Sequence, residues 1–227
     1  MNAIEINDLE FSYSIKSEQS ILRIADWSVK KGEQLFIYGP SGSGKSTLLN
    51  IICGLQLPQS GQVKVLGEAL NNMSKRQRDK YRAAHIGYIF QQFNLIDYLS
   101  AIDNIKLATH FSPNTKPSTV VAQIHNIITT LKLDAKDWHR PVNQLSIGQQ
   151  QRVGIARALI NQPKLIIADE PTSSLDQVAK DSFISLLTSL CEENGTTLLF
   201  VSHDMSLQNH FNSSIALNSI NNIKVDD

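Results

Sequence analysis

The chain of 227 residues has few cysteines, no net charge and no long apolar run, and each shortage excludes a class of protein. Its two cysteines, Cys53 and Cys191, lie far apart and fit no metal-ligand spacing, so the sequence predicts no disulfide framework and a reducing compartment. Lys+Arg and Asp+Glu are equal at 21 each, which gives no support for nucleic acid as the main partner. No run approaches the roughly 18 apolar residues of a membrane span, and no secretory signal pattern opens the chain, so we expect neither a membrane-spanning nor an exported protein.

Basic residues gather most closely at 75–82, in the sequence Lys-Arg-Gln-Arg-Asp-Lys-Tyr-Arg. Acidic and polar residues interrupt this cluster. We therefore interpret the segment as the solvated face of a helix rather than as a binding patch.

The most informative segment that is present is 39–46, Gly-Pro-Ser-Gly-Ser-Gly-Lys-Ser. It matches the phosphate-binding Walker A loop, whose pattern is Gly, four residues, Gly-Lys and then Ser or Thr. An apolar run at 35–38 precedes it as a predicted strand, and 47–52 opens a predicted helix, which is the context that the motif requires. Glycines let successive backbone N–H groups point at phosphate oxygens, and the helix start adds its positive end.

The loop therefore predicts a bound nucleotide, with Lys45 on the β- and γ-phosphates and the Ser46 hydroxyl on Mg²⁺. The predicted nucleotide-binding residues of the loop and helix start are Gly39, Pro40, Ser41, Gly42, Ser43, Gly44, Lys45, Ser46 and Thr47.

Hydrophobic patterning predicts an α/β fold. Alternating apolar and polar residues at 3–13 and 21–29 indicate antiparallel strands, whereas uninterrupted apolar runs at 164–168 and 197–201 indicate parallel strands covered on both faces. Two further short strands are predicted at 62–65 and 86–90, and a helix is predicted at 176–193. Apolar residues at helical spacing run through 97–161, with a loop at 112–117.

These elements predict a P-loop NTPase core with a mainly parallel sheet, an N-terminal antiparallel β subdomain and a helical insertion subdomain. We expect one domain over 1–227, in which 1–90 and 162–227 form the nucleotide-binding α/β core and 91–161 form the helical subdomain.

The segment 165–170, Leu-Ile-Ile-Ala-Asp-Glu, is a Walker B pattern, in which an apolar strand delivers carboxylates to its C-terminal end. Asp169 is predicted to hold Mg²⁺ through its water shell. Adjacent strand residues point in different directions, so Glu170 is predicted to face the attacking water as general base.

A third segment, 145–152, reads Leu-Ser-Ile-Gly-Gln-Gln-Gln-Arg and precedes an apolar helical stretch. Ser146 is a predicted helix N-cap. The residues alone leave two interpretations open, because a helix start with a free hydroxyl and a nearby glycine is either an anion site or simply a cap.

With these motifs in this order, the chain resembles the nucleotide-binding subunit of ATP-binding cassette (ABC) transporters over nearly its whole length. Leu145–Gln149 is similar to the family's signature Leu-Ser-Gly-Gly-Gln, which implies that Ser146, Gly148 and Gln149 contact the nucleotide of a second copy. Ser174-Leu175-Asp176 resembles the D-loop, and His203, directly after a predicted strand, resembles the switch histidine.

Two further roles are implied by the resemblance, each with a neighbouring competitor. Gln91 is similar to the Q-loop glutamine, near Mg²⁺ and the reacting phosphate, and the adjacent Gln92 is the alternative. Tyr13 falls where the family places an aromatic ring against adenine, and Phe11 is the alternative.

The signature-like segment departs from the family at its third position, where Ile147 replaces the usual glycine. A β-branched residue strongly resists positive φ. We therefore expect Ile147 to take a negative φ at the start of a helix, with its side chain directed away from the nucleotide.

The resemblance implies a head-to-tail dimer that encloses two ATP molecules with Mg²⁺, in which the catalytic residues are Glu170, His203, Lys45 and Gln91, and the metal residues are Ser46, Gln91 and Asp169. It also implies an integral membrane permease as partner, no nucleic acid partner, and a peripheral location on the cytoplasmic face of the inner membrane.

Segments 91–96 and 150–157 are similar to the lipoprotein-release, macrolide-efflux and cell-division subfamily, which implies export or mechanical transmission. The alternatives are the ATPase subunit of a small-solute importer, a soluble ABC ATPase acting on DNA or ribosomes, and a non-hydrolysing ATP-gated regulator. The intact Glu170 argues against the last of these.

Overall fold

The computed structural model describes residues 1–14, 20–112 and 117–223, so most of the loop expected at 112–117 lies outside the described residues. Five strands form a wholly parallel central sheet, in the order β6 (Ile86–Ile89), β7 (Leu165–Asp169), β8 (Thr197–Ser202), β3 (Gln34–Tyr38) and β9 (Ser213–Ala216). Every residue of β8 is buried, as expected for a parallel strand with both faces covered. The predicted parallel α/β core is confirmed.

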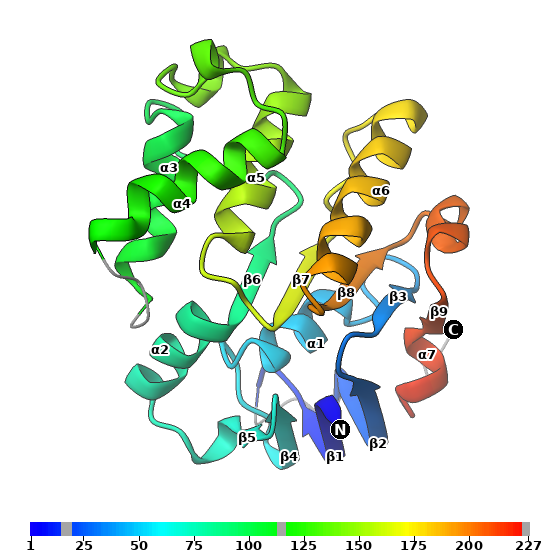
Figure 1. Cartoon of the computed structure of the whole chain (residues 1–227). Coiled ribbons are helices and arrows are strands. Elements are labelled where there is room, and N and C mark those ends of the chain that lie inside the picture. Colours follow the sequence, from blue (N-terminus) through cyan, green and yellow to red (C-terminus); the bar gives the residue numbers. More distant parts are fainter. Residues whose placement is uncertain (15–19, 113–116, 224–227) are drawn as a thin grey trace.

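A second sheet is antiparallel, in the order β2 (Leu22–Lys30), β1 (Asn2–Phe11), β4 (Ser60–Val65) and β5 (Glu68–Ala69). Buried and exposed residues alternate along β2, because one face of this sheet packs on the core and the other meets solvent. The N-terminal antiparallel subdomain is thus confirmed (Figure 1).

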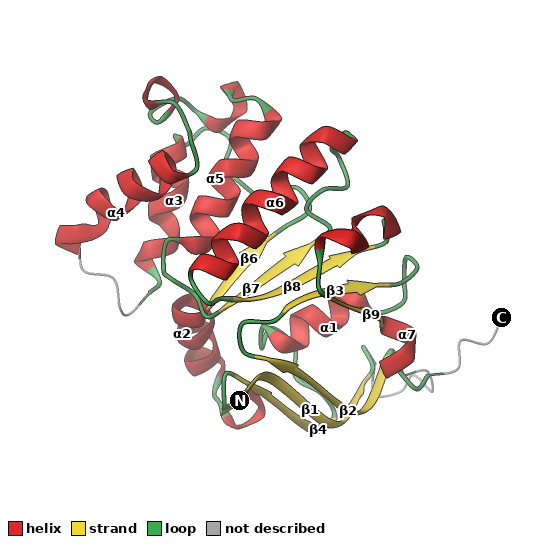
Figure 2. Cartoon of the chain, turned by 45° about the vertical axis from the view of Figure 1, so that its right-hand side comes forward, coloured by secondary structure: helices red, strands yellow, loops and turns green. Residues whose placement is uncertain are grey.

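The helices are α1 (Lys45–Ile52), α2 (Lys75–His85), α3 (Ala101–His110), α4 (Pro117–Thr130), α5 (Ile147–Leu159), α6 (Gln177–Glu193) and α7 (Leu217–Ile220). Figure 2 shows α1 between the parallel and antiparallel sheets, with α5 and α6 against the opposite face of the parallel sheet. Within the described ranges, no helix is both long enough and apolar enough to cross a bilayer.

The helical insertion shares its core with the parallel sheet. One buried cluster joins Ile105 of α3, Ile124 of α4 and Ile155 of α5 to Phe36 of β3 and Ile166 of β7. The insertion is therefore packed against the sheet, in part through the apolar side of α5. The division at residues 91 and 161 stays a prediction.

The basic cluster in α2 is not simply a solvated face, which corrects the sequence interpretation. Arg78 donates from Nε to the carbonyl of Gly54 at 2.9 Å, and Arg82 donates from Nη1 to the carbonyl of Cys53 at 3.1 Å. Both guanidinium groups satisfy carbonyls left free where α1 ends. The alternation of signs in the sequence does not reveal these partners, because they come from another element.

Replacing Gly87 with alanine should destabilise the protein by about 3 kcal/mol, because β6 and α5 are in backbone contact there. A Cβ atom at Gly87 would lie 2.4 Å from the carbonyl oxygen of Ala158. Urea unfolding measures the loss. The control is Gly32→Ala, where a Cβ meets nothing and only the positive φ of 77° is strained, which should cost about 1 kcal/mol. Equal losses in the two variants would contradict the steric account.

Candidate functional site

The loop after β3 forms a cradle that ends at the first turn of α1. Gly44, the N-cap of α1, has a φ of 99°, and Gly42 has a φ of 79°. Residues with a Cβ strongly disfavour both of these conformations. The two glycines turn the backbone so that its N–H groups face inward. The helix starts at Lys45, so its positive end lies directly at the loop.

Lys45 is held inside this cradle. Its side chain is only 6% exposed, and Nζ donates to the carbonyls of Gly39 at 2.8 Å and Pro40 at 2.9 Å. The hydroxyl of Ser43 is buried in the same loop without a hydrogen-bond partner. A buried hydroxyl without a partner is costly, and a phosphate oxygen in the cradle would accept a hydrogen bond from it. The loop therefore fits a phosphate group.

Asp169 ends β7 beside the loop. Burial raises the pKa of its carboxyl, while hydrogen bonds from the hydroxyls of Tyr88 and Ser46 lower the pKa. The Tyr88 hydroxyl lies 3.2 Å from Oδ2 of Asp169. In the part of the chain that the structure describes, no group of three or more His, Cys, Asp or Glu side chains could hold a metal ion. Asp169 and Ser46 offer a carboxylate and a hydroxyl, which are oxygen ligands of the kind that hard cations accept.

Glu170 follows β7 and takes a left-handed conformation, with φ at 47°. The sequence argument from strand alternation gave the right divergence for the wrong reason, because the strand has ended at Asp169. The turn aims the Glu170 carboxylate at two partners. Oε2 lies 2.8 Å from Nδ1 of His203, and Oε1 lies 3.7 Å from Nζ of Lys45.

A cavity of about 480 Å³ opens between these groups. Its lining residues are Tyr13, Ile21, Ser41, Gly42, Gly44, Lys45, Ser46, Thr47, Gln91, Asp169 and Glu170. Motifs far apart in the sequence thus share one cavity, and the cavity volume suits a small ligand. Ile21 and Tyr88 belong to this neighbourhood although no motif marks them.

The geometry distinguishes between the competitors left open by the sequence. Gln91 lines the cavity, whereas Gln92 does not. Tyr13 is 64% exposed, and its hydroxyl is 2.9 Å from the Thr47 hydroxyl. The Phe11 ring is buried and meets the Tyr13 ring edge to face at 5.2 Å. Only Tyr13 therefore offers a free ring face for stacking.

The signature-like segment lies apart from this cavity. Ser146 is the N-cap of α5, and it forms a reciprocal capping box with Gln149. Ser146, Ile147 and Gly148 are exposed, and none of them lines the cavity. Ile147 is the first residue of α5 and is not among the residues with positive φ, which confirms its expected backbone conformation.

The fold and the cavity define a class. A phosphate loop, a Walker B carboxylate pair, a histidine on the neighbouring strand end and a separate capped signature helix together make an ATP-binding cassette. The family model described as "ABC transporter" matches residues 22–173 of this chain.

Sequence relatives give the same result. The chain is 41% identical to YbbA, an ABC transporter ATP-binding protein of Escherichia coli (strain K12), over 91% of this chain and 90% of the relative. It is 40% identical to the lipoprotein-releasing system ATP-binding protein LolD of Shewanella denitrificans, over 84% of this chain and 81% of the relative. The chain therefore belongs to the ABC transporter family, as the ATP-binding and ATP-hydrolysing subunit.

Solved structures agree with this assignment. A dimeric post-hydrolysis structure of the ATP-binding cassette MJ0796, bound to ADP and Pi, has a TM-score of 0.82 and 35% identity, over 94% of this chain and 93% of that one. The cassette cbiO1 from Clostridium perfringens, part of the ABC transporter complex cbiONQ, has a TM-score of 0.84 and 25% identity, over 95% of this chain and 84% of that one.

Asp204, directly after His203, should make the free energy of unfolding decrease as the pH falls. A hydrogen bond from Lys180 at 2.5 Å, with a further one from Ser206, lowers the pKa of Asp204 from 3.8 to about 2. Because the folded-state pKa is depressed, this contribution is present above the unfolded pKa and is lost as pH falls from about 4 toward 2.

Urea midpoints measured from pH 5 to pH 3 should therefore fall less steeply in Asp204→Asn than in the unchanged protein. Lys180→Met, which removes the partner, should flatten the dependence in the same way. Parallel curves for all three proteins would show that the contact contributes nothing in this range.

Proposed function

We propose that two copies of this subunit close head to tail on two ATP molecules with Mg²⁺, and that hydrolysis at Glu170 reopens them to drive a membrane permease. One observation carries the proposal. The Walker residues line one cavity, while the signature residues Ser146 and Gly148 are exposed at a separate helix start. Groups so placed serve a nucleotide bound to another copy, and the dimeric form of the related cassette MJ0796 supports that arrangement.

Several residues of the cavity, together with the adjacent His203, have a part in this mechanism. The loop N–H groups and Lys45 bind the phosphates, and the ring of Tyr13 stacks on the adenine. Ser46, Asp169 and Gln91 would hold Mg²⁺, which would offset the phosphate charge. Glu170 accepts the proton of the attacking water, and His203 fixes the carboxylate in place through its contact at 2.8 Å.

The membrane partner would meet the helical insertion. Gln91 lines the cavity at the junction between β6 and the insertion, so closure on ATP would move the insertion through this segment. Phe90 and Tyr98 lie on either side of Gln91 in the sequence. Their aromatic side chains are 37% and 77% exposed, which suits contact with another protein. The subunit would then sit peripherally on the cytoplasmic face of the inner membrane.

The names of the relatives favour one direction of transport over the other. LolD is named for lipoprotein release, which favours export or mechanical transmission for this chain. The second candidate is the ATPase subunit of a small-solute importer. The similarity to cbiO1, part of the ABC transporter complex cbiONQ, keeps a transport system other than lipoprotein release open. The balanced charge of the chain favours a partner other than nucleic acid. Copurification of the tagged subunit with a permease containing a large extracytoplasmic domain would support the first candidate, and copurification with a complex that includes a solute-binding protein would support the second.

Glu170→Gln should bind ATP, hydrolyse it roughly 10²–10⁴-fold more slowly, and accumulate a dimer that forms only with ATP, because an amide replaces the base while Lys45 and Asp169 remain. Turnover is measured by phosphate release, and the dimer by size-exclusion chromatography with ATP and Mg²⁺. Glu192→Gln, at an exposed glutamate on α6, is the matched control and should behave as the unchanged protein. Normal turnover in Glu170→Gln would remove Glu170 from the role of base.

Ser146→Arg should leave ATP affinity of the monomer within about threefold, yet abolish hydrolysis, because a bulky cation would block closure on the partner's nucleotide. Calorimetry with ATP on dilute protein gives the affinity, and phosphate release gives the activity. Ser118→Arg, at an exposed serine of α4, is the control. If Ser146→Arg hydrolyses ATP at the normal rate, the signature does not act across a dimer.

A further inference from the structure

Asp137 is a fully buried carboxylate just ahead of the signature segment. It ends the 3₁₀ helix Ala135–Asp137 and is 0% exposed. Both of its oxygens are occupied: Oδ1 accepts from Nη1 of Arg140 at 2.8 Å, and Oδ2 accepts from Nε2 of Gln149 at 2.6 Å. A buried carboxylate is tolerated only when paired in this way, so the contacts specify a single arrangement.

The carboxylate dictates how the Gln149 amide is oriented. An ionised carboxylate accepts hydrogen bonds and cannot donate them, so the NH₂ group of Gln149 must face Asp137. The amide oxygen is thereby turned to the helix start, where it accepts from the backbone N–H of Ser146 at 2.8 Å. In return, the Ser146 hydroxyl accepts from the backbone N–H of Gln149 at 3.3 Å. Asp137, Gln149 and Ser146 thus form a chain of hydrogen bonds, here called the relay, in which the Ser146 N–H donates to Gln149 and Gln149 donates to Asp137.

The same charge cluster holds the chain that leads into the helix. Arg140 donates from Nη2 to the carbonyl of Gln144 at 3.1 Å, and Gln150 donates to the carbonyl of Leu145 at 3.0 Å. The backbone before Ser146 is therefore fixed from two sides. This restraint is independent of residue 147, and it operates with isoleucine there because α5 begins at Ile147 with ordinary helical geometry.

We propose that Asp137 is a positioning residue for the signature, and that Gln149 serves the helix start of its own subunit rather than the nucleotide. The inference rests on the proposed function, because Ser146 matters only if it meets the partner's ATP. It changes the sequence expectation for Gln149, whose side-chain oxygen and nitrogen are both engaged within the subunit. Asp137 itself touches no nucleotide and acts through Gln149.

Variants that place a negative charge at residue 149, with or without the one at residue 137, test the relay. Gln149→Glu keeps a side chain that serves well in an ordinary capping box, yet it places a second carboxylate against Asp137. In the Glu170→Gln background, the ATP concentration that gives half-maximal dimer should rise by about tenfold, the scale of losing a hydrogen bond to a charged group.

The double variant Asp137→Asn with Gln149→Glu should restore the relay in reverse polarity. The new amide at 137 donates to the new carboxylate at 149, which still accepts from the Ser146 N–H, and Arg140 keeps an oxygen partner. Half-maximal dimerisation should return to within about threefold of the parent. Simple repulsion between a glutamate at 149 and the partner's phosphates predicts no such rescue, because that glutamate is present in both variants.

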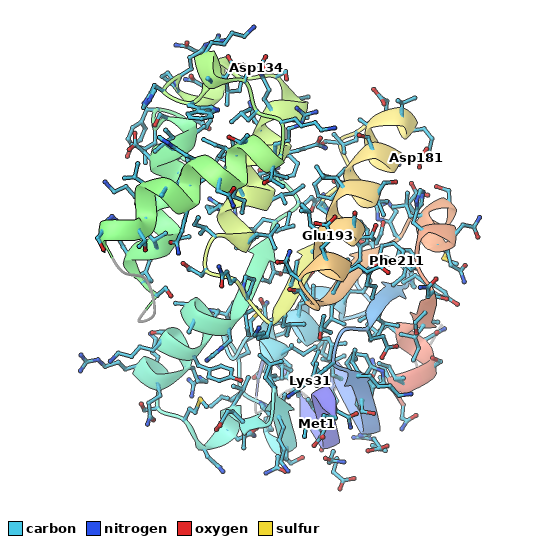
Figure 3. All side chains as sticks on the ribbon, viewed as in Figure 1. Met1, Lys31, Asp134, Asp181, Glu193 and Phe211 are labelled. Atoms are coloured by element: carbon cyan, nitrogen blue, oxygen red, sulfur yellow. The ribbon has the colours of Figure 1, made fainter. Side chains whose placement is uncertain are left out.

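The control is Asp134→Asn, which makes the same change of carboxylate to amide three residues earlier. Asp134 is 69% exposed, pairs with the exposed Lys136, and lies at the outer end of the helical insertion (Figure 3). It should dimerise as the parent does. Amide exchange of the monomer without ATP gives a readout that needs no dimer: the Ser146 N–H should exchange faster in Gln149→Glu and recover in the double variant.

The outcomes distinguish the positioning role of Asp137 from the proposed ATP-dependent dimer. Unchanged dimerisation in Gln149→Glu, or no rescue in the double variant, overturns the positioning role while the proposed dimer stands. A parent that forms no ATP-dependent dimer overturns the proposed function itself. Loss and rescue of both dimerisation and protection of the Ser146 N–H is the result we expect.

Discussion

The hydrogen bonding of β7 to β8 and of β8 to β3 is the constraint on which the site depends. In this register Asp169 lies opposite Val201, and Tyr38 lies opposite Ser202. All three strands are parallel, so their C-terminal ends meet at one edge of the sheet. The phosphate loop, the Walker B carboxylates and His203 each leave a strand there. A slip of one residue in β7 would turn Asp169 to the opposite face of the sheet.

The charges gathered at this edge are only partly compensated by the protein. Lys45 is buried and Asp169 is partly buried, and this burial raises the pKa of Asp169. Lys45 lies 3.7 Å from the Glu170 carboxylate, a distance beyond a hydrogen bond. Such a site gains more from a ligand that brings both phosphates and a cation than from rearranging its own side chains.

The signature segment illustrates a different solution. A glycine at position 147 would leave the helix start free to adopt several conformations, whereas isoleucine restricts it. The capping box between Ser146 and Gln149, fixed by the buried Asp137, holds the same start in one geometry. Because α5 then packs on the parallel sheet through Ile155, and Gly87 brings β6 into contact with its C-terminal end, the signature is linked to the nucleotide edge by packed structure.

The sequence by itself determined the class of the protein, because its signals are local. The spacing of Gly39 to Ser46, the apolar strand before Asp169 and the cap at Ser146 depend on neighbours within a few residues, and the structure has strands and helices where these patterns predict them. The parallel core and the antiparallel N-terminal sheet followed from apolar periodicity for the same reason.

Only the tertiary structure decided what depends on contact between distant segments. It separated Gln91 from Gln92 and Tyr13 from Phe11 by which side chain reaches the cavity. It showed Arg78 and Arg82 on carbonyls at the end of α1, the left-handed turn at Glu170, and the pairing of Asp137 with Gln149. No periodicity or motif encodes such contacts, because a hydrogen bond across the fold depends on where two elements pack and not on the spacing of residues within either one.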